Sequence, residues 1–316
     1  MKWLSAASTY ELPASKQSPS QKEKRFKRWN HACCAAVLFI FLAVPAAFGQ
    51  VNFSQVVSFG DSLTNNDILG LYYGNPHDMY GADAMEATFK KGAKSGNRLT
   101  TYAVASMESD YLEAEIGIYM VALIFGQQKK ATLFCIEIGG NDILNNLNII
   151  KAYPPGKNKS ADKVVNNIIQ NIRNGFNLLK RSHPKAQFVL WTVPDVTLTP
   201  TEWQKNTSTE TANIQAHLKR LNLAIQKLGD SSVVVLDLYT LIQNFVSSPP
   251  VIYGQQLLLP PVHSEYDSIF ADEIHPTAVS NALIANTIIN QMNTKWHVAI
   301  ASYTEAQLAK LAHIQQ

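Results

Sequence analysis

The sequence predicts an α/β fold: a three-layer α/β/α sandwich with a five-stranded parallel sheet. Two observations carry this prediction. Short apolar runs alternate along the chain with segments whose apolar residues recur at helical spacing. The short runs are also apolar nearly throughout rather than at every second residue, as is typical of parallel strands that helices cover on both faces.

Five short runs rich in β-branched and aromatic residues are the predicted strands. They span residues 54–60, 101–106, 132–139, 186–193 and 232–238. Parallel strands end at the same edge of their sheet, and folds of this class bind ligands there. Residues that directly follow the strands are therefore expected to lie together at this carboxyl edge.

Helices are predicted between the strands. One is expected to be capped by Ser160, because apolar residues recur at helical spacing from Val165 to Leu179. A second spans roughly 209–228, with Gly229 as a stop signal, and a last one begins at Pro276. Residues 107–127 and 295–316 are predicted to form additional surface helices.

The first 49 residues have the pattern of a targeting segment. A basic run, "KEKRFKRWN", precedes the apolar residues 32–49, and small residues stand directly before Gln50. This pattern predicts a cleaved signal peptide and a secreted or periplasmic protein, with an uncleaved membrane anchor at 32–49 as the alternative. Residues 50–316 are then expected to form a single catalytic domain.

The charge distribution argues against a nucleic-acid partner. The whole chain has a formal net charge of +3, but residues 1–49 hold seven of its 27 Lys and Arg residues and two of its 24 acidic residues. Residues 50–316 therefore carry 20 bases against 22 acids, without a basic surplus. Cys135 is the only cysteine beyond residue 49, and its apolar context predicts an inert core residue rather than a disulfide partner.

Three motifs fall on the predicted carboxyl edge or directly before the last helix. They are "FGDSLT" around Ser62, "IGGNDIL" around Asn141, and "FADEIHPT", which contains Asp272 and His275. Acyl transfer requires a hydroxyl, an imidazole that takes its proton and a carboxylate that orients the imidazole, together with donors for the oxyanion. Ser62, His275 and Asp272 supply the first three groups. The Asn141 amide and the Ser62 backbone N–H, at an expected helix start, supply donors; if Ser62 were only a helix cap, the other motifs would be coincidences.

In this order, "FGDSLT", "GGND" and "DEIHPT" resemble blocks I, III and V of the GDSL (SGNH) hydrolase family of esterases and lipases. The resemblance covers most of residues 54–290 and implies an SGNH, flavodoxin-like fold. It also implies that Ser62 is the nucleophile, His275 the general base, Asp272 its partner and Asn141 an oxyanion donor. The α/β-hydrolase pattern G-x-S-x-G fits less well, because Thr64 stands at its last glycine.

The second block departs from the family pattern, where a glycine N–H is an oxyanion donor. In "TYAVASM", Ser106 stands at a position that glycine often occupies, and Gly96 in "KSGN" is the alternative donor. Ser106 is favoured because it follows a predicted strand, whereas Gly96 precedes one. A serine there is expected to have a backbone conformation that does not demand glycine.

Substrate class is inferred from two loops that mix apolar residues with prolines, 145–162 and 247–268, as would suit a wall against an acyl chain. They predict hydrolysis of lipid esters by a lysophospholipase or lipase, with acyl transfer and peripheral membrane contact as further expectations. One alternative is a deacetylase of acetylated glycans, and another is a binding protein that has lost turnover. No residue cluster suggests a metal or an organic cofactor, so none is expected.

Overall fold

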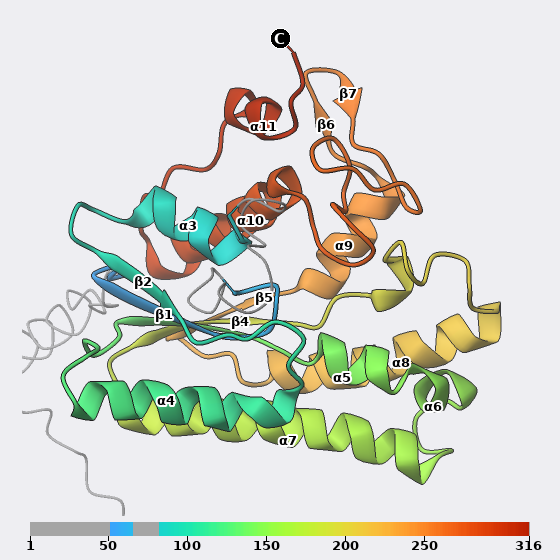
Figure 1. Cartoon of the computed structure of the whole chain (residues 1–316), viewed down its shortest axis with the longest axis horizontal. Coiled ribbons are helices and arrows are strands. Elements are labelled where there is room, and N and C mark those ends of the chain that lie inside the picture. Colours follow the sequence, from blue (N-terminus) through green and yellow to red (C-terminus); the bar gives the residue numbers. More distant parts are fainter. Residues whose placement is uncertain (1–50, 66–81, 316) are drawn as a thin grey trace, which may run out of the picture. The chain divides into compact units, whose positions relative to one another are not determined.

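The computed structural model describes residues 51–65 and 82–315. The predicted signal peptide or anchor at 1–49 lies outside the described residues. Within them, the central element is a five-stranded sheet in the order β2-β1-β3-β4-β5, and every neighbouring pair of strands is parallel (Figure 1). The predicted parallel α/β sandwich is confirmed.

The strands are short, and those in the middle of the sheet are completely buried, as their continuous apolar sequences predict. Their bounds are β1 Gln55–Gly60, β2 Arg98–Thr101, β3 Leu133–Glu137, β4 Gln187–Trp191 and β5 Val233–Leu236. The pairing of β1 with β3 joins Val56 to Leu133 and Gly60 to Glu137. The register therefore sets the glycine before Asp61–Ser62 opposite the last residue of β3.

The prediction for the second strand was wrong in position. Residues 101–106 were expected to form it, whereas β2 covers Arg98–Thr101, pairs with β1 only and lies at the edge of the sheet. An edge strand is covered on fewer sides, so its residues need not be apolar. The apolar residues beyond it still follow β1, since the N–H groups of Tyr102 and Val104 donate to the carbonyls of Ser58 and Gly60.

Helices cover both faces of the sheet, and each layer encloses a hydrophobic core (Figure 1). One face is covered by α3 Ala84–Gly92 and α10 Ala278–Trp296, with α9 Leu238–Ser247 and α11 Glu305–Leu311 in the same core. The other is covered by α4 Leu112–Ile124, α7 Lys159–Ser182 and α8 Ser208–Gln226. Shorter elements complete the described chain: α5 Gly140–Asn145, α6 Leu147–Ala152, the 3₁₀ turns Ser109–Tyr111 and Val196–Leu198, and the hairpin β6 Val251–Ile252 with β7 Gln255–Gln256.

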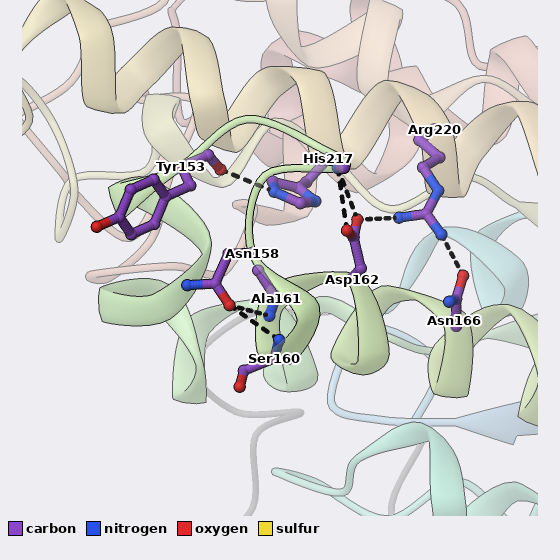
Figure 2. Close-up of polar contacts among 9 residues, drawn as sticks. Tyr153, Asn158, Ser160, Ala161, Asp162, Asn166, His217 and Arg220 are labelled. Atoms are coloured by element: carbon purple, nitrogen blue, oxygen red, sulfur yellow. Dashed lines mark hydrogen bonds and ion pairs between the residues drawn. The ribbon is translucent and has the colours of Figure 1, made fainter.

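Two helices begin at other residues than predicted. The Asn158 side chain caps α7 by accepting from the N–H groups of Ser160 and Ala161, so Ser160 lies inside the first turn (Figure 2). Thr277 caps α10 through the Ser280 N–H, so Pro276 lies before the helix. The predicted helices at 107–127 and 209–228 are confirmed within a few residues by α4 and α8, and α11 lies within the predicted 295–316 segment. No helix among the described residues is both long and apolar enough to cross a membrane.

Candidate active site

Ser62 lies in the turn that directly follows β1. Gly60 ends the strand with φ +137°, and a side chain there would collide with the Glu137 backbone, because its Cβ would lie 1.6 Å from the Glu137 carbonyl oxygen. Glycine is therefore required where β1 and β3 approach each other most closely. The turn is closed by the Thr64 N–H, which donates to the Asp61 carbonyl at 3.2 Å. The helix expected to start at Ser62 would continue beyond Asn65, into residues outside the described ranges.

Asp272 and His275 share one tight loop before α10. Asp272 Oδ1 accepts from the backbone N–H groups of Ile274 and His275 at 2.8 and 2.7 Å, while its Oδ2 lies 2.8 Å from His275 Nδ1. The other ring nitrogen, Nε2, lies 2.8 Å from Ser62 Oγ. The structure thus brings together three side chains, of which Ser62 and His275 are 213 residues apart in the sequence. When Nδ1 carries the ring proton and its N–H donates a hydrogen bond to Asp272, Nε2 is unprotonated and can accept the Ser62 proton.

Asn141 lies between the Ser62 turn and the loop after β2. Its Nδ2 donates to Asp61 Oδ2 at 3.3 Å and to the Met107 carbonyl at 3.0 Å. Gly139, with φ +117°, turns the chain from β3 into α5 and so brings Asn141 to the carboxyl edge. The amide therefore touches the residue before Ser62 and the residue after Ser106.

Ser106 occupies the third position of a hydrogen-bonded turn. The Met107 N–H donates to the Val104 carbonyl at 3.2 Å, and Ser106 has φ +67° while Ala105 has no positive φ. This is the pattern of a type II turn, whose third residue is normally glycine. The expectation that a serine here avoids a glycine-like conformation was wrong.

Gly96, the alternative donor, lies at the other end of β2. It lies two residues before Arg98, which pairs with Gln55 at the start of β1, whereas the Val104 N–H bonds to the Gly60 carbonyl at the end of β1. The structure therefore places Ser106 at the edge that holds Ser62, and Gly96 at the opposite edge.

With this geometry established, the comparison with protein families can be made. A family model, described as GDSL-like lipase/acylhydrolase, matches residues 56–288, which include Ser62, Asn141, Asp272 and His275. The chain belongs to this family. Membership supports a hydrolase.

Solved structures with the same kind of fold include several esterases and lipases, all distant in sequence. The lipase Lip_vut3 from a goat rumen metagenome is 16% identical, with a TM-score of 0.49 and coverage of 75% of this chain and 96% of that one. An extracellular lipase from Streptomyces rimosus is 17% identical, with a TM-score of 0.47 and coverage of 77% and 99%. The acetylxylan esterase Axe2 from Geobacillus stearothermophilus is 12% identical, with a TM-score of 0.47 and coverage of 78% and 96%. No curated protein sequence is a significant match.

In this member of the family, three buried acids lie behind the Ser62 turn. Glu115 of α4 accepts the Gly60 N–H through Oε2 at 2.9 Å, and the Asp61 carboxyl lies close enough to that of Glu137 of β3 for the two to interact. Buried carboxyl groups in such proximity favour the protonated form. Burial raises the pKa of Glu115 to about 9 and that of Glu137 well above its usual range, with the Asp61 charge adding to both.

Sequence reasoning missed Glu115 and Glu137 as residues of this site. The available signal was a charged residue inside an otherwise apolar stretch, in "LEAEIGIYM" and "LFCIEIG". Asp61 accepts the Leu63 N–H at 3.1 Å within its own turn, and it also interacts with Glu137 and accepts from Asn141. The acids thus join the Ser62 turn to α4, β3 and the Asn141 amide.

Asp142 fixes the loop that carries Ser106 and Met107 to the start of α5. Its carboxylate accepts from the N–H and the hydroxyl of Ser109 at 2.8 and 2.7 Å, and burial raises its pKa to about 6.

Among residues 51–65 and 82–315, no group of three or more His, Cys, Asp and Glu side chains has the arrangement of a metal site.

The turn conformation at Ser106 leads to a prediction about stability. Because a left-handed backbone costs a residue with a side chain about 1–2 kcal/mol, we expect Ser106→Gly to raise the free energy of unfolding by up to about 1 kcal/mol, after the larger entropy loss of glycine is subtracted. Denaturant unfolding measures this change. Ser160→Gly, in the first turn of α7, is the matched control and should lower the stability. Equal destabilisation by both changes would contradict the prediction.

Proposed function

We propose that the protein is an exported serine esterase that hydrolyses carboxylic esters of lipids through an acyl-enzyme. The observation that carries the proposal is the continuous set of contacts from Asp272 to His275 Nδ1, and from His275 Nε2 to Ser62 Oγ, each 2.8 Å long. This is the arrangement that nucleophilic catalysis by a serine requires.

In the first half-reaction, Ser62 Oγ attacks the ester carbonyl carbon while His275 Nε2 takes its proton. The imidazolium that forms is stabilised by Asp272, whose second oxygen is held by the N–H groups of Ile274 and His275. His275 then gives the proton to the leaving alkoxide as the ester bond breaks. In the second half-reaction a water molecule attacks the acyl-enzyme, His275 takes its proton, and Ser62 Oγ leaves with that proton restored.

Three donors are proposed for the oxyanion: the backbone N–H groups of Ser62 and Ser106, and the Asn141 amide. The contacts of Asn141 with Asp61 and with the Met107 carbonyl support this assignment, because they place its amide between the turn of Ser62 and the loop of Ser106. Both amide hydrogens are donated in these contacts, so donation to the oxyanion exchanges one of them. Ser106 is preferred to Gly96 because it shares the edge of the sheet with Ser62. Preorganised donors of this kind stabilise the charge that develops in the transition state.

A lipid substrate is supported by the loops beside the site. The 247–268 loop has half-exposed apolar side chains at Leu258 and Val262, and His263 Nε2 in it lies 3.7 Å from Oε1 of Glu273, which stands between Asp272 and His275. Apolar side chains in a loop that reaches the Asp272–His275 loop favour an acyl chain over a sugar.

The 145–162 segment, expected to be a loop, contains α6 and the first turn of α7 and is held on α8, as a binding wall requires. His217 Nε2 lies 3.0 Å from the Tyr153 carbonyl oxygen, and Arg220 donates to Asp162 Oδ1 at 2.8 Å; both contacts are drawn in Figure 2. Asp162 also accepts the Gly156 N–H at 3.1 and 3.0 Å. These bonds keep the half-exposed Tyr153 in one place.

A panel of p-nitrophenyl esters from acetyl to palmitoyl, with lysophospholipid alongside, tests the proposal. Each buried CH₂ contributes up to about 0.8 kcal/mol, so kcat/KM for octanoyl ester should exceed that for acetyl ester at least about tenfold. A preference for acetyl would replace the lipid substrate by acetylated glycans. Absence of hydrolysis for every ester would favour a binding protein.

A further inference from the structure

The outer side of α4 is apolar, although it is exposed in the described part of the chain. The exposed fractions are 61% for Ile118, 52% for Val121, 79% for Ile124 and 73% for Phe125. We call these four residues the apolar stripe. They follow one another at helical spacing on the side opposite Leu112, Ile116 and Tyr119, which face the core. An exposed apolar surface of this kind marks an interaction site.

Charges of opposite sign stand at the two ends of the apolar stripe. The exposed acids Asp110 and Glu113 precede it, and the exposed bases Lys129 and Lys130 follow it. Between Glu113 and Lys129 the only acidic or basic residue is Glu115, which is buried. No ion pair of these four exposed residues occurs within the described ranges.

We propose that this surface is the contact between two copies of the chain, related by a twofold axis that passes near Val121. Val121 lies in the middle of the apolar stripe. Glu113 stands in the first turn of α4, which ends at Ile124, and Lys129 follows the turn at Gly126 beyond the other end, so an antiparallel pair of α4 helices brings the acids of one copy to the bases of the other. Both ends of the stripe are then paired at once, while its apolar side chains cover one another. Ala114 and Gly117, exposed on the same side, let the helices approach closely.

The charge pattern favours a second copy over a lipid surface. An anionic membrane would attract Lys129 and Lys130 but repel Asp110 and Glu113, whereas an antiparallel copy offers the opposite charge at both ends. The contact is small. A helix of this length is about 20 Å long, so one helix from each copy buries less surface area than a standard interface does. We therefore expect a dimer that dissociates on dilution.

Cysteine cross-linking of the full-length chain tests the axis. A residue near a twofold axis meets its own copy, so Val121→Cys should form a disulfide-linked dimer under mild oxidation. Thr209→Cys, exposed on α8, is the matched control and should remain monomeric. The unmodified chain is oxidised in parallel to measure any cross-linking through Cys33 and Cys34. Cys135 is buried and is not expected to react. Equal cross-linking of Val121→Cys and Thr209→Cys, or none for either, would overturn the proposal.

Charge reversal tests the pairing in the same cross-linking assay. Glu113→Lys and Lys129→Glu each replace two attractive contacts of the dimer by repulsive ones, so each should reduce the yield of cross-linked Val121→Cys about tenfold at low salt. The double reversal restores the attraction and should restore the yield. A double variant no better than either single one contradicts the pairing. Binding of the protein to anionic vesicles, lost in Lys129→Glu but unaffected by Glu113→Lys, would identify a lipid surface as the partner instead.

Discussion

Ser62→Ala is expected to lower kcat for ester hydrolysis by a factor on the order of 10⁵–10⁶ and to leave KM within a few-fold of its value. The hydroxyl is the atom that attacks the carbonyl in the proposed mechanism, and His275 Nε2 lies 2.8 Å from it. The methyl group of alanine cannot replace it. Steady-state kinetics on the best p-nitrophenyl ester measure the effect.

Two controls separate chemistry from folding in the Ser62→Ala measurement. Ser62 is only half-buried, so the thermal midpoint of Ser62→Ala should stay close to that of the unmodified protein. Ser106→Ala removes a second hydroxyl near the site but keeps the backbone N–H and should retain most of the activity. Hydrolysis by Ser62→Ala at the original rate would show that the nucleophile is another group.

Gly60→Ala is expected to prevent the protein from folding or to lower its free energy of unfolding by more than about 4 kcal/mol. The new Cβ would lie 1.6 Å from the Glu137 carbonyl oxygen and 2.9 Å from Thr64 Oγ1, and φ +137° is a conformation that alanine avoids. Relief would require β1 and β3 to separate in the centre of the sheet. Soluble yield and denaturant unfolding measure the loss.

Gly117→Ala is the matched control for Gly60→Ala. Gly117 lies in α4 with open space around its Cα, so alanine there should raise the stability by about 0.5–1 kcal/mol. A Gly60→Ala protein that unfolds at the same denaturant concentration as the original would contradict the close approach of the two strands.

The central strands and the order of the site motifs could be predicted from the sequence because both are local properties. The buried runs at β3 and β4 are apolar throughout, and the Asp272–His275 loop is only four residues long. The edge strand β2 was placed too late, since a strand covered on fewer sides does not need an apolar sequence. The predicted cap of α7, Ser160, lies two residues after the observed cap, Asn158. Serine and asparagine cap helices equally well, and no local pattern separates the two positions.

The family and its fold were predicted correctly from three short motifs and are confirmed by the match over residues 56–288. The roles of Ser62, Asp272, His275, Asn141 and Ser106 stay predictions, which the kinetic variants check. The predicted export signal lies in residues outside the described ranges.

The sequence by itself determined which residue types carry the chemistry and at which ends of the strands they stand. Only the tertiary structure decided the left-handed backbone at Ser106, the contact of Gly60 with Glu137 and Glu115, and the burial of Asp61 beside Glu137. Gly60 and Glu115 are 55 residues apart, and Asp61 and Asn141 are 80 apart. Such contacts depend on how strands and helices pack, and burial then sets the pKa values, so no local sequence pattern specifies them.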